Sequence, residues 1–402
     1  MKELRNIPVE KLALQLAGRS DIDVAYVLRQ AEGWQRLRHK VPTWAAIDNL
    51  VYPHRLALEQ CSGEQAARYK AGVVKKLMDA LPDHPLSMAD LTGGLGVDFS
   101  FIARHFAHAV YVEQQESLCE LARHNFPLLD LNQAEVVCAD GVNYLHTMPA
   151  TDLLFLDPAR RDGAGRKTVL IEDCEPDVCT LSPLLLEKAS VVMLKLSTML
   201  DITGAIRSLD CVAQVHVVSV GGECKDLLLV LAHPDLWAAL GKQFAGNAYN
   251  GSEPLMIAHE GDTSLLFTET DEAKAQPHYT ATPETYLYEP GPAVLKAGAF
   301  KIVGQRWGLD KLHPNSHLYT SNKAIPDFPG RSFCIESVYS FGKADLRALR
   351  SSTPQANLTV RNFPATVDAL RKKLKLREGG NIYLFATTLA DGSHVLLRCH
   401  KI

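Results

Sequence analysis

The segment from 88 to 96, Met-Ala-Asp-Leu-Thr-Gly-Gly-Leu-Gly, limits what this chain can fold into more than any other. The short, mostly apolar stretch 86–89 is typical of the end of a buried parallel strand, and Asp90 stands where that strand ends. From 97 to 106, apolar residues recur at helical spacing. The turn between strand and helix is formed by Thr92, Gly93, Gly94 and Gly96. Glycines let a backbone approach a ligand, and the helix N-terminus faces it, so the segment predicts a nucleotide-sized site.

Three later segments repeat the pattern of an apolar strand that ends in an acid. They are 109–113, 135–140 and 152–158, and their acids are Glu113, Asp140 and Asp157. Ligands of open α/β sheets bind at the carboxyl ends of the strands. We therefore expect these acids and Asp90 to surround one site, although each acid alone could be a strand-end cap or part of a solvated turn.

Two classes of nucleotide compete for such a site. The dinucleotide fingerprint G-x-G-x-x-G would begin at Gly94, but Phe99 stands where its third glycine belongs. Asp90, directly before the turn, would repel a pyrophosphate and suits a ligand that carries positive charge. S-adenosylmethionine, with an α-amino group and a sulfonium, is such a ligand.

From about 70 to 233 the sequence resembles the class I S-adenosylmethionine-dependent methyltransferases. Their first motif, an acid followed by a glycine-rich loop, corresponds to Asp90, Gly94 and Gly96, and Thr92 replaces its first glycine. The resemblance implies a Rossmann-like sheet that ends in an antiparallel hairpin, with S-adenosylmethionine as the cofactor.

The same resemblance implies roles for the later acids. Glu113 would hold the ribose, Asp140 the adenine amino group, and Asp157 would lie beside the reactive methyl group. We expect no metal, because the nine cysteines include no C-x-x-C pair.

Asp157, Pro158, Ala159 and Arg160 resemble the acid/Asn-Pro-Pro-aromatic motif of methyltransferases that modify base nitrogens. In that motif the acid and a backbone carbonyl accept hydrogen bonds from the target amine. Ala159 replaces the second proline, and Arg160 replaces the aromatic residue, although a guanidinium plane also stacks on a base. Asp157, Pro158 and Arg160 are the catalytic candidates, and the target atom stays open. The glycine-containing loop 161–167 is predicted to close over the substrate.

The sequence also predicts where several lysines lie. Lys195 lies inside the apolar strand 191–196, and burying an unpaired ammonium is costly. It therefore either lines the substrate cleft or forms an ion pair at a strand edge. A helix from 62 to 81 precedes the sheet, and we expect its Lys70, Lys75 and Lys76 to point outward.

The last part of the chain, 331–402, reads as a βαβαββ unit and carries twelve Lys or Arg against five Asp or Glu. Because the net charge is −4 overall, this unit holds +7 and the remaining residues −11. It resembles the ferredoxin-like and THUMP-like RNA-binding modules of tRNA-modifying enzymes. A basic cluster on its second helix is the RNA-binding candidate, with a solvated helix surface as the alternative. The cluster is Arg371, Lys372, Lys373, Lys375 and Arg377.

We expect an α/β fold of four parts: a helical region at 1–70, a methyltransferase domain at 71–235, a small intermediate domain at 240–330 and the THUMP-like α+β domain at 331–402. The sequence contains no apolar run long enough to span a membrane, and its first residues do not form the apolar core of a signal peptide. We therefore expect the protein to be located in the cytoplasm. The oligomeric state stays open.

The whole chain resembles bacterial methyltransferases that carry a C-terminal THUMP-like domain. This resemblance implies methylation of a base nitrogen in RNA, either tRNA or rRNA. Two alternatives stay open: a methyltransferase of proteins or small molecules, and a non-catalytic RNA-binding protein that has kept the nucleotide fold.

Overall fold

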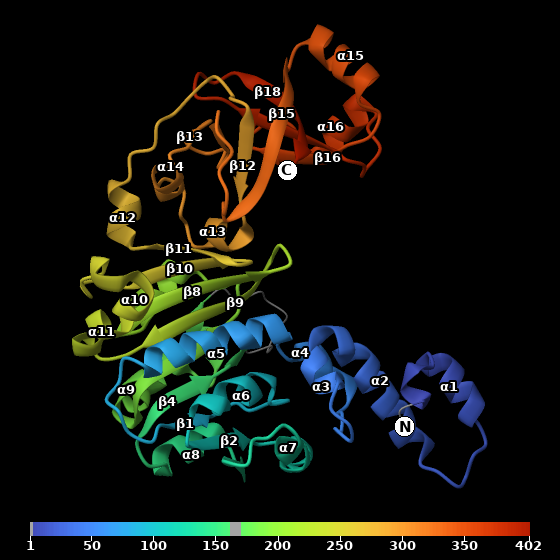
Figure 1. Ribbon diagram of the computed structural model, residues 1–402, viewed down its shortest axis with the longest axis vertical. Helices are drawn as coiled ribbons and strands as arrows, with labels where there is room; N and C mark the ends of the chain where they lie inside the picture. Colours follow the sequence, from blue (N-terminus) through green and yellow to red (C-terminus); the bar gives the residue numbers. More distant parts are fainter. Residues whose placement is uncertain (1–2, 161–169) are drawn as a thin grey trace. The chain divides into compact units, whose positions relative to one another are not determined.

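The computed structural model describes residues 3–160 and 170–402, so the predicted loop 161–167 lies outside the described residues (Figure 1). The chain divides into two compact units. The first contains the residues up to Val215 together with Lys225–Leu255, and the second contains His216–Cys224 and Met256–Ile402.

A nine-stranded sheet, in the order β11-β10-β8-β9-β7-β4-β1-β2-β3, contains the predicted core. The strands are β1 (Ser87–Asp90), β2 (His108–Glu113), β3 (Ala134–Cys138), β4 (Thr151–Leu156), β7 (Ala189–Leu196), β8 (Val212–Val220), β9 (Glu223–Leu231), β10 (Leu255–Glu260) and β11 (Thr263–Phe267). Strands β3, β2, β1, β4 and β7 are parallel, and β9 runs antiparallel to β7. The predicted Rossmann-like sheet is confirmed. A separate antiparallel pair joins β5 (Ala159–Arg160) to β6 (Cys174–Glu175).

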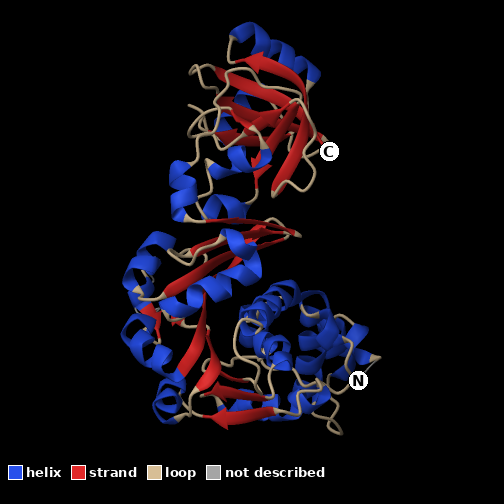
Figure 2. Ribbon diagram, turned by 60° about the vertical axis from the view of Figure 1, so that its left-hand side comes forward, coloured by secondary structure: helices blue, strands red, loops and turns tan. Residues whose placement is uncertain are grey.

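Helices cover both faces of the parallel sheet (Figure 2). The α-helices of the first unit are α1 (Val9–Leu16), α2 (Val24–Lys40), α3 (Pro42–Ala45), α4 (Arg55–Gln60), α5 (Glu64–Met78), α6 (Val97–Ile102), α7 (Glu116–Leu128), α8 (Gly141–Thr147), α9 (Val178–Lys188), α10 (Ile202–Ser208) and α11 (Pro234–Ala245). Short 3-10 helices lie at Leu4–Asn6, Ala103–His105, Ile171–Asp173 and Gly246–Ala248. Leu153 and Leu154 of β4 are both fully buried, as expected for a strand covered on both faces.

The N-terminal region is attached by hydrogen bonds to two helices that cover the parallel sheet, α6 and α7. Asn125 of α7 is fully buried; its Oδ1 accepts from Val51 N at 2.9 Å and its Nδ2 donates to Val51 O at 2.8 Å. The indole of Trp44 donates to Ser100 Oγ of α6 at 3.1 Å. The expected boundary at 70 falls inside α5, so one continuous helix crosses it.

The second unit is built on a seven-stranded sheet in the order β13-β14-β12-β15-β18-β17-β16. After β11, the elements of this unit are α12 (Glu269–Lys274), β12 (Tyr286–Pro290), α13 (Pro292–Lys296), α14 (Ile302–Trp307), β13 (Asp310–Lys311), β14 (Tyr319–Ser321), β15 (Gly330–Ser340), α15 (Lys343–Ser352), β16 (Asn357–Arg361), α16 (Val367–Leu374), β17 (Ile382–Thr388) and β18 (His394–Lys401). From β15 onward the order is the predicted βαβαββ. The helices α15 and α16 pack through Leu349 and Leu370 against Leu384 of the sheet.

The segment expected to form an intermediate domain at 240–330 is instead divided between the two sheets. Strands β10 and β11 extend the first sheet, whereas β12, β13 and β14 join the second, where β12 pairs with β15. Leu287, Leu312 and Leu318 pack together with Phe333 and Phe385 in one apolar cluster of the second unit. None of the described helices is long and apolar enough to cross a membrane.

Candidate active site

The glycine turn after β1 is fixed against β2 by close backbone approach. Gly94 and Gly96 have φ of 55° and 81°, the left-handed region that favours glycine. A Cβ on Gly93 would lie 2.2 Å from the ring of Tyr111, so no larger residue fits there. The Gly93 amide donates to Val112 O at 2.9 Å, and the Tyr111 hydroxyl donates to Gly94 O. Gly94 and Gly96 are thus required by the backbone conformation, and Gly93 by the close contact with Tyr111.

Glu113, at the end of β2, closes the other side of this turn. Its side chain is largely buried, with Oε2 accepting from Gly94 N at 2.8 Å and Oε1 accepting from Gln115 N at 2.9 Å. A carboxylate oxygen can accept more than one hydrogen bond, so the hydroxyls of a ribose can still bind here. The position suits the expected contact.

Asp140, after β3, has a local role that its sequence position had left open. It caps α8, where Oδ1 accepts from Asn143 N at 2.9 Å, and its side chain is exposed. Strand β3 lies beside β2 in the sheet, so Asp140 and Glu113 follow neighbouring strands.

Thr92 connects the glycine turn to the catalytic candidate. Its backbone N and its hydroxyl donate to Asp90 Oδ1, at 2.9 and 3.3 Å, and its Oγ1 accepts from Asp157 N at 2.6 Å. A glycine at this position would lack the hydroxyl. The departure of Thr92 from the methyltransferase motif therefore has a structural purpose, which the sequence alone did not reveal.

Lys195 of β7 pairs with Asp157, and this supplies the partner that a lysine in an apolar strand requires. The Lys195 ammonium donates to Asp157 Oδ2 and lies 3.8 Å from Asp98 Oδ2. Although burial lowers the pKa of Lys195, these two carboxylates hold it above the ordinary value. Lys195 is therefore a cation, and it neutralises one oxygen of Asp157.

The prediction that Lys70 points outward was wrong. Its side chain is fully buried, and its Nζ lies 3.0 Å from Asp98 Oδ1, pairs with Asp226 of β9 and donates to Ser62 Oγ at 3.1 Å. Lys75, by contrast, is exposed as predicted.

Helical spacing was the signal that placed Lys70 on the buried side. It lies three residues after Ala67 and four before Val74, and both of those side chains are fully buried.

Asp98, in the first turn of α6, joins the two lysines and was not recognised from sequence. Its Oδ2 accepts from Ser62 Oγ at 2.7 Å. Burial raises the pKa of Asp98, but Lys70 and Lys195 outweigh this and hold it below the usual range. Asp98 is therefore a stable anion between two ammonium groups.

Negative charge exceeds positive charge around this site, which suits a cationic ligand. Burial raises the pKa of Asp90 to about 8, with the Asp98 and Asp157 carboxylates adding to the effect. Even without Asp90, which this shift leaves protonated at neutral pH, three carboxylates interact with two ammonium groups: Asp98, Asp157 and Asp226 with Lys70 and Lys195. The α-ammonium and sulfonium of S-adenosylmethionine would offset the excess, so the donor set fits this cofactor.

Asp90→Asn should change how stability depends on pH. Folded Asp90 keeps its proton to about pH 8, whereas the unfolded chain releases it near 3.8, so the native state binds more protons between these values. Wild-type stability should therefore fall, relative to the variant, by about 1.4 kcal/mol for each pH unit between 5 and 7. Chemical denaturation of both proteins at pH 5, 6 and 7 measures this. A difference that stays constant with pH would contradict the assignment.

Pro158 is buried directly after Asp157. Arg160 ends β5, where its backbone pairs with Cys174 of β6, and its side chain lies outside the part of the chain that the structure describes. The predicted stacking role of Arg160 therefore stays a prediction.

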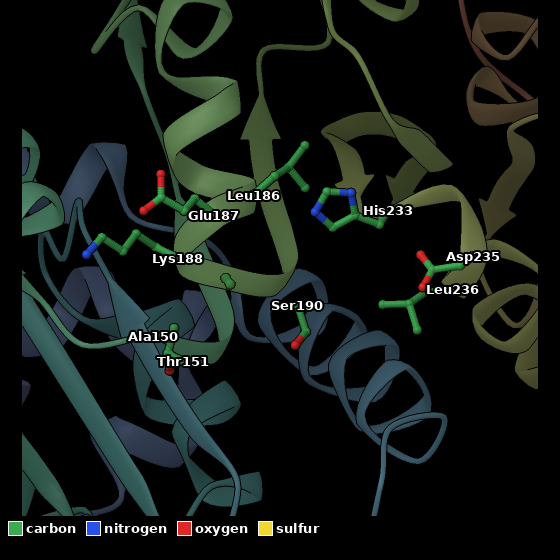
Figure 3. Close-up of a pocket in the computed structure, with 10 residues that line it drawn as sticks. Ala150, Thr151, Leu186, Glu187, Lys188, Ser190, His233, Asp235 and Leu236 are labelled. Carbon is green, nitrogen blue, oxygen red and sulfur yellow. The ribbon is translucent and has the colours of Figure 1, made fainter.

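A surface pocket lies at the opposite edge of the sheet (Figure 3). It is lined by Thr151 and Ala189, where β4 and β7 begin, and by His233 and Asp235 around the start of α11. Asp157 and Lys195 lie at the other ends of these two strands. None of the residues proposed for the site lines this pocket.

The basic cluster of the second unit is only partly helical. Helix α16 ends at Leu374, Lys375 adopts a left-handed conformation with φ 53°, and Arg377 lies beyond the helix. Arg371 pairs with Glu378 at 2.9 Å, and the ammonium of Lys373 lies 4.2 Å from the ring centroid of Phe341. Cations in a last helical turn also stabilise the helix dipole. The side chains of Lys372, Lys373, Lys375 and Arg377 are exposed to solvent.

Known proteins match both parts of the chain. Residues 286–329 match a ferredoxin-like domain family, and residues 330–401 match the THUMP domain-like family. A crystal structure of a protein from Porphyromonas gingivalis W83, described as a "putative methyltransferase", is 37% identical. The alignment covers 100% of this chain and 96% of that chain, with a TM-score of 0.83. An uncharacterised S-adenosylmethionine-dependent methyltransferase of Mycobacterium tuberculosis is 25% identical over 340 residues, which is 84% of each chain.

Proposed function

We propose that this chain, which belongs to the class I S-adenosylmethionine-dependent methyltransferases with a C-terminal THUMP-like domain, methylates a base nitrogen of RNA. The observation that carries the proposal is the link from the glycine turn through Thr92 to Asp157. It joins the binding site of a cationic cofactor to a partly exposed carboxylate that can accept hydrogen bonds from an amine.

The acids at the ends of the parallel strands hold the cofactor in this proposal. Glu113 accepts from the ribose hydroxyls, Asp140 from the adenine amino group, and Asp90 faces the positively charged end. Asp90 is well suited to this because a cation beside it favours its ionised form. Bound S-adenosylmethionine supplies the electrophilic methyl group.

Asp157 and the backbone beyond it orient the target. An ionised carboxylate only accepts hydrogen bonds, so it binds the N–H groups of an amine and directs the nitrogen lone pair toward the methyl group. Burial raises the pKa of Asp157 above its ordinary value, and Lys195 opposes this by favouring the ionised form. Such a transfer depends on positioning and on exclusion of water more than on a strong base.

The charge distribution favours RNA as the substrate over a protein or a small molecule. The THUMP-like part carries +7 although the rest of the chain carries −11, and a polyanion is the natural partner of such a surface. The ion pair between Asp157 and Lys195 beside the cofactor site argues against a protein that only binds RNA.

Methyl transfer to extracted RNA tests the proposal. The purified protein is supplied with S-adenosylmethionine labelled in its methyl group and with RNA from a strain that lacks the gene. We expect label in this RNA and none in RNA from the parent strain, whose sites are already methylated. Mass spectrometry of nucleosides then identifies the modified base. Label in protein or in small molecules alone would support the alternative substrates and reject RNA.

Replacing Lys372, Lys373 and Lys375 together by Ala should weaken RNA binding and its dependence on salt. Each neutralised phosphate of a single strand contributes about −0.7 to the slope of log affinity against log salt concentration. The slope should therefore flatten by up to about 2 units. The measurement is the affinity for total tRNA at several salt concentrations.

A matched control removes three exposed lysines of the first unit, Lys75, Lys76 and Lys242. It changes the net charge by the same amount, so a general charge effect would flatten both slopes equally. Equal slopes in the two variants would mean that the basic cluster around α16 is only a solvated surface.

A further inference from the structure

We propose that Lys195 occupies the place of the substrate amine on Asp157 and moves onto Asp98 when that amine binds. This inference rests on the proposed function, because it assigns a positioning role at the same site. The ammonium of Lys195 would keep Asp157 neutralised until the target arrives and would then yield its hydrogen-bonding position.

Lys195 already lies between two carboxylates. Its Nζ donates to Asp157 Oδ2 and is 3.8 Å from Asp98 Oδ2, which is within ion-pair distance. An ammonium has three N–H donors on a flexible four-carbon stem, so it can exchange one acceptor for another by a small rotation. The structure thus contains both the occupied position and the alternative.

Asp98 is the fixed member of this arrangement. Its Oδ2 accepts from Ser62 Oγ at 2.7 Å, and its Oδ1 lies 3.0 Å from the Lys70 ammonium, which Asp226 also holds. The side chain of Asp98 is only 11% exposed. Lys70 of α5 and Ser62 fix the carboxylate of Asp98 in place. The exchange therefore requires movement of the Lys195 side chain only.

Asp157 is the accessible member. Its side chain is 43% exposed, against 12% for Lys195, so a group that arrives from solvent meets the carboxylate before the ammonium. An incoming amine also offers N–H donors to this carboxylate, although it carries no charge, unlike the ammonium that it displaces. A lysine released without a second carboxylate would be a partly buried charge without a partner, which is costly. Asp98 removes that cost.

The exchange can be tested without knowing the RNA. Sinefungin is an S-adenosylmethionine analogue that carries an ammonium group where the cofactor has its methylsulfonium, whereas S-adenosylhomocysteine carries no charge there. The ammonium of sinefungin therefore stands in for the arriving amine. Calorimetry gives, for each variant, the affinity for sinefungin divided by the affinity for S-adenosylhomocysteine. An effect of the substitution that is the same for both ligands cancels in this ratio.

Lys195→Met removes the competing ammonium, so sinefungin should bind about ten-fold tighter relative to S-adenosylhomocysteine. Asp98→Asn removes the receiving carboxylate, so Lys195 stays on Asp157 and the ratio should fall. Adding Asp157→Asn to Lys195→Met should abolish the gain. Lys195→Gln, which keeps a polar side chain in β7, should reproduce the gain if methionine disturbs folding.

If Lys195 only anchors Asp157, its replacement should change the affinity ratio in the opposite direction. Its loss would disorder the carboxylate, so Lys195→Met and Lys195→Gln would weaken sinefungin or leave the ratio unchanged, and either result overturns the inference. In that case normal binding of S-adenosylhomocysteine would leave the proposed function intact. If wild-type protein bound neither ligand, the assigned cofactor site itself would be wrong, and the inference would fall with it.

Discussion

Lys70→Met should destabilise the first unit by about 3 to 5 kcal/mol, because it leaves two buried carboxylates without their shared cation. Lys70 is fully buried between Asp98 and Asp226, and methionine fills the space of its stem without supplying charge. Urea denaturation measures the effect. In a Trp307→Phe background the three remaining tryptophans, at 34, 44 and 237, all lie in the first unit, so their fluorescence reports on that unit alone.

Two further variants separate charge from packing in this experiment. Lys75→Met lies on the same helix, but Lys75 is 61% exposed and pairs with the exposed Asp79, so its loss should change stability little. Combining Lys70→Met with Asp98→Asn and Asp226→Asn removes the unpaired charges and should recover much of the loss. If Lys70→Met behaves like Lys75→Met, the buried ion cluster does not stabilise the fold.

The parallel strands and the acids that end them could be predicted from sequence because both patterns are local. An apolar run of four to six residues followed by Asp or Glu reads the same whatever lies elsewhere in the chain. Strands β1 and β2 were expected at 86–89 and 109–113 and are Ser87–Asp90 and His108–Glu113. The βαβαββ order of the last part was predictable for the same reason.

The ion cluster could not be predicted in this way, because its partners are far apart in sequence. Lys70 and Asp226 are separated by 156 positions, and Thr92 and Asp157 by 65. Helical spacing places Lys70 on the buried side of α5, but only the tertiary structure shows that Asp98 and Asp226 meet it there. Burying an ammonium without a partner costs free energy, so a solvent-exposed Lys70 was the expected arrangement as long as no partner was known.

The sequence does not show how 240–330 is divided between the two sheets, for a related reason. A strand pattern does not specify which sheet the strand joins, and β12 pairs with β15 across the expected boundary at 330. The second helix of the last part was expected to carry the whole basic cluster, but α16 ends at Leu374. Lysine is a good helix former, and Lys375 nevertheless adopts a left-handed conformation. Two buried side chains, Leu374 and Leu376, flank it and hold the chain in that path.

Asp157→Asn should reduce methyl transfer to RNA at least about 100-fold while S-adenosylmethionine affinity stays within a few-fold. Asparagine keeps the size of the side chain, and the backbone bond from position 157 to Thr92 Oγ1 does not depend on it. It cannot form the ion pair with Lys195, however, and its amide presents N–H donors where the target amine needs acceptors. The transfer assay uses labelled cofactor and RNA from the deletion strain, and calorimetry measures affinity for the cofactor.

Asp235→Asn is the matched control, since Asp235 is an exposed carboxylate at the opposite edge of the sheet, beside the pocket of Figure 3. Both variants lose one negative charge, but only Asp157 is placed to touch the reacting nitrogen. Turnover should therefore fall for Asp157→Asn and stay normal for Asp235→Asn. Near-normal turnover of Asp157→Asn would show that the Asp157-Pro158 motif serves the fold, and the chemistry would then have to be sought in other residues at the carboxyl ends of β4 and β7.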